Sequence, residues 1–160
     1  MKPARGDTWL VIGVVALCLA PHLASRPAWT GPAVAALLAL RAVLARRAAA
    51  LPGRWPLLAL LLAGAGASWL SHGTLVGREA GITMAVLLLA LKTLEWRTRR
   101  DTFVGVFLGL FVVMAWFFAD QSALTALWAL VACTGLLGLL VLAHLPQGRP
   151  SMRCSLGVTA

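Results

Sequence analysis

A charged segment between residues 92 and 101 holds the side chains of this chain best placed to do chemistry. Lys92 and Glu95 are three residues apart and Glu95 and Arg99 are four apart, spacings that place side chains on one face of a helix. In the second pair the acidic Glu95 precedes the basic Arg99, which is the favoured order. We therefore predict an ion network in which charges neutralise one another. Its members are Lys92, Glu95, Arg97, Arg99, Arg100 and Asp101.

A second polar cluster is predicted from residues that border long apolar runs. Its members are His72, Arg78, Glu79, Asp120, Gln121 and Ser122. Glycines at four-residue spacing accompany it, namely Gly73, Gly77 and Gly81, followed by Gly105 and Gly109. Such spacing lets helix backbones approach closely in lipid, which favours helix packing over the alternative of a groove for a ligand or a lipid.

The familiar catalytic and metal-binding patterns are absent from the sequence. Cys18 and Cys133 lie within apolar runs and Cys154 lies near the end, so none belongs to a CxxC pair. No HExxH, P-loop or GxSxG pattern occurs. The five acidic residues form no paired cluster for hydrolysis. We therefore predict no catalytic residue, no metal ligand and no cofactor.

The elements that must position these residues are apolar segments of membrane length. The chain is 61% hydrophobic with a mean hydropathy of +0.89, whereas soluble domains are about 45–50% apolar and about 20 apolar residues cross a bilayer. We predict an all-α, polytopic integral membrane protein with six spans. Their approximate ranges are Thr8 to Ala24, Ala28 to Ala45, Trp55 to Ser71, Arg78 to Trp96, Thr102 to Ala119 and Ser122 to His144.

The cations of the chain indicate how these spans are oriented. The formal charge of +9 could suggest a nucleic-acid partner, but the basic residues separate apolar runs instead of forming a basic face. Twelve of the fourteen Lys and Arg fall on one side of the predicted topology, and Arg26 and Arg78 fall on the other. The positive-inside rule then places both termini in the cytoplasm. We expect no nucleic-acid partner.

Three expectations concern individual segments. Pro21 and His22 interrupt the first span, so a broken or re-entrant hairpin is compatible with the sequence. Arg41 is expected to extend its side chain toward the membrane surface. The ion network is open to two interpretations, an interfacial device that sets helix depth or an intramembrane functional site.

Residues 73–101, GTLVGREAGITMAVLLLALKTLEWRTRRD, followed by FVGVFLGLFVVMAWFFADQS, resemble the membrane region of TgpA-like bacterial transglutaminases. The ALCLAPHL stretch near the amino terminus fits the same family, and the resemblance covers roughly residues 10 to 145. It implies an inner-membrane protein whose helices precede an extracytoplasmic transglutaminase-like domain with Cys, His and Asp in its active site. The cysteines of this chain do not match the catalytic thiol.

From the resemblance we expect a multispanning membrane domain over residues 1–145 and a short polar tail over 146–160. The expected function is a membrane anchor or scaffold for a transglutaminase-like protein in the bacterial inner membrane, without enzymatic activity of its own. Expected partners are membrane lipids and a transglutaminase-like domain or another cell-envelope protein. A truncated or frameshifted product and a separately encoded membrane half remain open. The alternative function is a small autonomous transporter or lipid-binding protein.

Overall fold

The chain folds into helices joined by short connections. A computed structural model describes residues 5–25, 27–47, 49, 52–73, 77–96 and 98–144. Within these ranges it contains six helices and no strand, which confirms the all-α prediction and places every helix within a few residues of its expected range. The helices are α1 (Arg5–Ser25), α2 (Thr30–Arg47), α3 (Arg54–His72), α4 (Arg78–Glu95), α5 (Arg99–Phe117) and α6 (Ala123–His144). The tail predicted over 146–160 lies outside the described residues.

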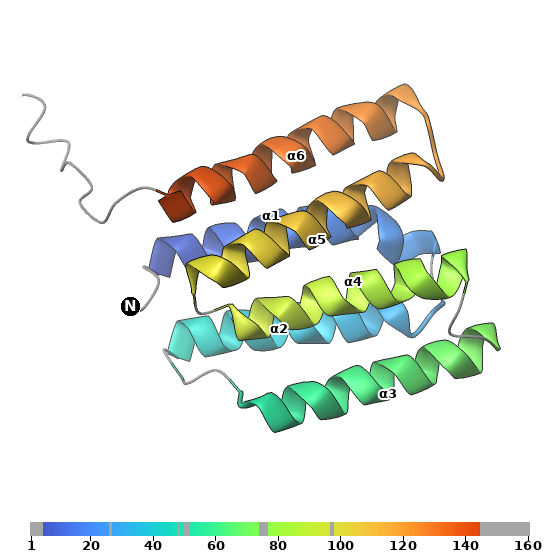
Figure 1. Cartoon of the computed structure of the whole chain (residues 1–160), viewed down its shortest axis with the longest axis horizontal. Helices are drawn as coiled ribbons and strands as arrows, with labels where there is room; N and C mark the ends of the chain where they lie inside the picture. The colour runs from blue at the N-terminus through green and yellow to red at the C-terminus, as the bar shows by residue number, and fades with distance from the viewer. Residues whose placement is uncertain are drawn as a thin grey trace, which may run out of the picture.

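Each helix runs antiparallel to the next one in the chain (Figure 1). The first residues of α1, α3 and α5 therefore share one end of the bundle with the last residues of α2, α4 and α6 (Figure 1). We call this the basic end, because Arg46, Arg47, Lys92 and Arg100 lie on the turns of helix that form it. Arg78, Glu79 and Asp120 lie at the opposite end.

Helix α4 is the centre of the bundle. It packs against α1, α2, α3 and α5, and eleven of its residues are buried, from Ala80 to Leu94. Helix α3 occupies an edge and, among the described helices, packs against α4 alone. Because four helices pack around α4, a charged side chain in its last turn, such as that of Lys92, lies close to residues of neighbouring helices.

Helix α1 continues through Pro21 as one unbroken helix, so the expected break is absent. A proline cannot donate to the carbonyl four residues earlier, which here belongs to Leu17. Trp128 of α6 supplies the missing donor, since its Nε1 donates to the Leu17 carbonyl at 3.2 Å. The buried His22 ring donates from Nε2 to the Val112 carbonyl of α5 at 3.0 Å. The bond from Trp128 satisfies the carbonyl that Pro21 leaves without a backbone donor, which makes the proline tolerable.

The predicted glycine packing is correct on α5 and wrong at Gly81. A Cβ on Gly105 would overlap the ring of Trp96, and a Cβ on Gly109 would lie 2.8 Å from Leu136 Cδ2. These two glycines therefore permit close packing around α5. Gly81 faces open space. Gly73 ends α3 with a φ of +69°, and its N–H bonds the Trp69 carbonyl, so this glycine is needed for the turn.

Two helices meet a criterion of length and composition for crossing a membrane. These are α5 over Arg100–Phe117 and α6 over Ala123–Ala143. The apolar parts of α1 and α3 are shorter, Thr8–Leu23 and Trp55–Ser71. Helices α2 and α4 carry charges near their ends, including Arg46 and Arg47 on α2, and these charges interrupt an otherwise apolar segment.

Arg41 does not extend outward as expected. Its side chain is only 6% exposed, and its Nε has no hydrogen-bond partner within the described residues. Helix α2 packs against α4, and the buried residues of α2 include Val34, Leu37 and Arg41. Arg41 is therefore enclosed by this packing.

Candidate functional site

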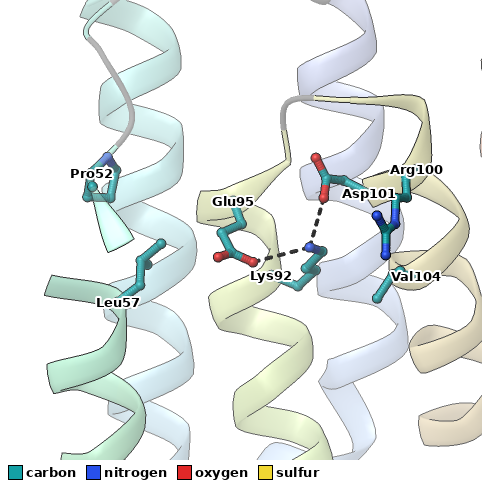
Figure 2. A pocket seen from close by; sticks show the side chains of 8 residues that line it. Pro52, Leu57, Lys92, Glu95, Arg100, Asp101 and Val104 are labelled. Atoms are coloured by element: carbon teal, nitrogen blue, oxygen red, sulfur yellow. Dashed lines mark hydrogen bonds and ion pairs between the residues drawn. The ribbon is translucent and has the colours of Figure 1, made fainter. Parts of the chain in front are cut away.

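Lys92 is the centre of the charged cluster at the basic end. Its Nζ lies 3.1 Å from Glu95 Oε2 and 2.9 Å from Asp101 Oδ1. The Lys92 side chain is 16% exposed, compared with 19% for Asp101 and 50% for Glu95. Figure 2 shows the ammonium between the two carboxylates. The less exposed Asp101 is therefore the stronger partner, since screening by solvent weakens exposed ion pairs.

Asp101 is held in place by the start of α5. Thr98 is the N-cap residue, and the two residues form a capping box. Asp101 Oδ2 accepts from the Thr98 backbone N–H and from Thr98 Oγ1, both at 2.8 Å. Thr98 Oγ1 in turn accepts from the Asp101 N–H at 3.3 Å. One carboxylate oxygen therefore caps the helix while the other pairs with Lys92.

Trp96 fixes the path of the chain between α4 and α5. It follows the last residue of α4 in an extended conformation, and its ring is buried. Its Nε1 donates to Thr102 Oγ1 at 2.9 Å, while its ring lies directly over Gly105. This packing brings the first turn of α5 back against the last turn of α4, and with it Asp101 against Lys92.

A pocket of about 490 Å³ opens beside this ion network. It lies where α3 begins, α4 ends and α5 begins (Figure 2). Its lining combines four charged side chains with apolar walls: Pro52, Gly53, Leu57, Lys92, Glu95, Arg100, Asp101 and Val104. Both signs of charge therefore face one concave surface.

The structure brings together only part of the predicted ion network. Lys92, Glu95, Arg100 and Asp101 line the pocket, whereas Arg97 lies outside the described residues. Arg99 begins α5, and its side chain lies outside what the structure describes. The predicted helical pairing of Glu95 with Arg99 is wrong, because α4 ends at Glu95 and the two residues belong to different helices.

The second predicted cluster forms a helix cap. Ser122 Oγ accepts from the Thr125 N–H at 3.2 Å at the start of α6. Asp120 accepts from the Ser122 N–H at 3.0 Å and from Thr125 Oγ1 at 2.7 Å. Gln121 is exposed in the same turn. These contacts satisfy helix N–H groups and serve the fold directly.

The remaining members of this cluster belong to other helices. Arg78 and Glu79 form the exposed first turn of α4, where the Glu79 carbonyl accepts from Thr83 Oγ1. His72 ends α3, and its side chain lies outside what the structure describes. All these residues occupy the end of the bundle opposite Lys92 (Figure 1).

The pKa of Asp120 lies below its ordinary value of 3.8. The main cause is the hydrogen bond from the Thr125 hydroxyl, followed by the bond from the Ser122 backbone. Both donors favour the ionised carboxylate. Asp120 therefore remains charged at neutral pH and continues to cap α6.

The described residues offer no site for a metal ion. Within them no group of three or more His, Cys, Asp or Glu lies close enough to hold one. Cys18 is buried and Cys133 half-buried, and both are free thiols, while Cys154 lies outside the described residues. What the pocket does provide is a pair of cations and a pair of carboxylates that can bind a charged group.

Sequence reasoning missed the pairing of Asp101 with Lys92. Helical spacing predicts Glu95 as the partner of Lys92 and assigns no particular partner to Asp101 within the ion network. The usable signal was the T-x-x-D pattern of Thr98 and Asp101, which predicts a capping box and hence the start of a new helix. A capping box at Thr98 would have assigned Asp101 the role of a helix cap, which differs from the role of Arg99 and Arg100.

Comparison with known proteins identifies the class to which this bundle belongs. The model of the TgpA N-terminal domain matches residues 10–160. The chain is a member of the TgpA N-terminal domain family, as the resemblance in its sequence predicted.

A particular relative extends this assignment. The chain is 42% identical over 140 residues to the protein-glutamine gamma-glutamyltransferase of Pseudomonas aeruginosa. The match covers 87% of this chain but only 21% of that relative, so the chain spans about a fifth of the length of the enzyme it matches. It corresponds to the N-terminal domain of a transglutaminase family protein. No solved structure matches the chain.

Proposed function

We propose that this chain is the membrane anchor of a transglutaminase family protein, with six helices crossing the bacterial inner membrane and no catalytic activity of its own. In this proposal the catalytic Cys, His and Asp belong to an extracytoplasmic domain of the full-length protein, which one further membrane crossing after α6 connects to these helices. The match to the N-terminal fifth of a protein-glutamine gamma-glutamyltransferase supports the link to this chemistry.

The observation that carries the proposal is the large apolar side chains exposed over the outside of the bundle. Leu70 is 89% exposed and Trp55 is 83% exposed. Others occur on every helix, including Leu10 on α1, Leu40 on α2, Leu88 on α4, Phe107 on α5 and Leu124 on α6. Monomeric soluble proteins rarely expose continuous apolar surface beyond a few hundred Å². Hydrocarbon is the environment that suits this surface.

The lengths of the helices also suit a bilayer. The shortest helices have 18 residues and the longest has 22. At about 1.5 Å per residue the shortest are about 27 Å long, close to a hydrocarbon thickness of about 30 Å. Charges on α2 and α4 lie mainly in their terminal turns, where Lys and Arg side chains can reach the headgroups.

The distribution of cations favours one orientation. Arg46, Arg47, Lys92 and Arg100 lie at the basic end, whereas Arg78 lies at the opposite end. The positive-inside rule places the basic end in the cytoplasm. Since α1 begins and α6 ends at the basic end (Figure 1), both described ends of the chain would face the cytoplasm.

Fractionation and reporter fusions test this proposal. The chain should remain in the membrane pellet after an alkaline carbonate wash. Alkaline phosphatase fused after Asp120 should be active, and the same reporter fused after Arg99 should be inactive. The reverse pattern would contradict the orientation, and release by the wash would contradict the anchor.

A separate assay tests the assignment of catalysis to another domain. The purified chain should form no glutamyl amide bond between a glutamine-containing peptide and an amine. Acyl transfer by the purified chain alone would show that the non-enzymatic assignment is wrong.

A further inference from the structure

The pocket at the basic end has balanced charge. Lys92 and Arg100 contribute two cations, while Glu95 and Asp101 contribute two carboxylates. Lys92 is already paired with both acids, and Asp101 also caps α5. The groups left to meet a ligand are therefore Glu95, half of whose side chain is exposed, and the exposed Arg100. These two residues carry opposite charges.

This arrangement selects among charged ligands. A purely anionic ligand would be attracted by Arg100 but repelled by the two carboxylates. A purely cationic ligand would be attracted by Glu95 but repelled by Lys92 and Arg100. A ligand that carries both a cationic and an anionic group can meet both Glu95 and Arg100, which line the same pocket. A guanidinium binds phosphate through paired N–H donors, and a carboxylate accepts hydrogen bonds from a primary ammonium.

Apolar surface continues from the pocket along the bundle. Leu57 and Val104 are part of the lining, from α3 and α5 respectively. Leu88 lies seven residues before Glu95, on the same face of α4, and is exposed. Phe107 and Phe111 are exposed beyond Val104 on α5. Because α3 packs against α4 and not against α5, no other described helix covers the strip of α4 between them, where Leu88 is exposed.

We propose that the pocket binds the headgroup of a phospholipid of the phosphatidylethanolamine class. Arg100 contacts the phosphate, the free oxygen of Glu95 accepts from the ammonium, and the acyl chains lie along Leu88, Val104 and Phe107. Lys92 holds Glu95 in position and neutralises Asp101. This inference rests on the proposed placement in the membrane, which brings the pocket to the level of the inner-leaflet headgroups.

Native mass spectrometry of the purified chain tests this proposal. The chain is mixed in detergent with equal amounts of phosphatidylethanolamine, phosphatidylcholine and phosphatidylglycerol carrying the same acyl chains. We expect the phosphatidylethanolamine adduct to exceed the phosphatidylcholine adduct about fivefold, which corresponds to about 1 kcal/mol. The choline group has no N–H to donate to Glu95.

Paired variants locate the site. Glu95→Gln should reduce the preference for phosphatidylethanolamine over phosphatidylcholine, because a neutral amide oxygen accepts from an ammonium more weakly than a carboxylate. Arg100→Gln should reduce both adducts. Both variants retain the Lys92–Asp101 pair and the capping box, so both should fold. Arg78→Gln and Glu79→Gln, a matched cation and acid at the opposite end, should leave all adducts unchanged. An equal loss in these controls would overturn the assignment to this pocket.

Other outcomes also decide against the proposal. Equal adducts of all three lipids would overturn it, and a preference for phosphatidylglycerol would indicate a simple anionic-lipid contact. A dimer without bound lipid would assign the apolar face to a second copy of the chain. Displacement of the lipid by millimolar soluble phosphoethanolamine would show that the acyl chains contribute nothing. If the chain fails to sediment with membranes, the anchor proposal itself fails; a membrane-bound chain with no lipid preference refutes only the pocket.

Discussion

Asp101 and Asp120 lie at opposite ends of the bundle in similar local surroundings. Each accepts hydrogen bonds from a threonine hydroxyl at the beginning of a helix, Thr98 for α5 and Thr125 for α6. Asp101 also binds Lys92, nine residues earlier on α4. The hydrogen bonds described for the Asp120 carboxylate remain within residues 120–125. Both carboxylates therefore cap a helix, but only Asp101 also contacts a cation on the preceding helix, and only there does the cap form part of a charged pocket.

The packing of Trp96 on Gly105 is what creates this difference, and breaking it should have the largest effect. Gly105→Ala places a methyl group in the Trp96 ring, and we expect a loss of about 3 kcal/mol in the free energy of unfolding, the upper range for overpacked sites. Thermal unfolding in mild detergent measures this loss. Gly81→Ala, which faces open space, is the matched control and should be as stable as the parent or slightly more stable. Equal losses in both would show that the ring contact is unimportant.

Removing the shared carboxylate should have the next largest effect. Asp101→Ala removes both a helix cap and a partner of Lys92, and we expect a loss of about 2 kcal/mol. Glu95→Ala should cost only about 0.5 kcal/mol, because that side chain is half exposed and Asp101 continues to pair with Lys92. Adding Lys92→Met should recover part of the loss in the Asp101 variant. A double-mutant cycle measures the coupling, and simple additivity of Lys92→Met and Asp101→Ala would contradict it.

At the opposite end a cap variant should act locally. Ser122→Ala removes the acceptor for the Thr125 N–H, and we expect a loss of about 1 kcal/mol, a typical value for a lost N-cap. The same loss should appear in the Lys92→Met background, because the two sites lie at different ends of the bundle. Unfolding by denaturant in detergent provides the comparison. A loss that changes with the Lys92 background would mean that the two ends are coupled.

The smallest effect should be visible only in acid. Since the pKa of Asp120 is lowered by folding, its ionised form contributes stability above its ordinary value of 3.8, and that contribution disappears as the pH falls through the lowered pKa. Asp120→Asn should therefore be less stable than the parent at neutral pH, and the gap should close as the pH falls through the lowered pKa. Melting temperatures of both proteins across this range test the sign. A gap that widens in acid would contradict it.

The sequence by itself determined the number and limits of the helices, since long apolar segments separated by Arg, Pro and Gly leave few alternatives. It also determined the family, because the order of polar and charged residues within 73–101 is characteristic of that family, whereas a hydrophobic composition alone is common to many membrane proteins. Helix periodicity could not predict the Asp101–Lys92 pair, because periodicity relates residues within one helix and this pair spans a turn. The turn depends on Trp96 packing over Gly105.

The tertiary structure also decided which polar groups are satisfied. Pro21 is compatible with a continuous α1 because Trp128, distant in sequence, donates to the Leu17 carbonyl. Arg41 is buried because α4 packs on its face of α2. Local sequence fixes the helices through backbone hydrogen bonding and apolar length, whereas side-chain partners across helices depend on how the helices pack.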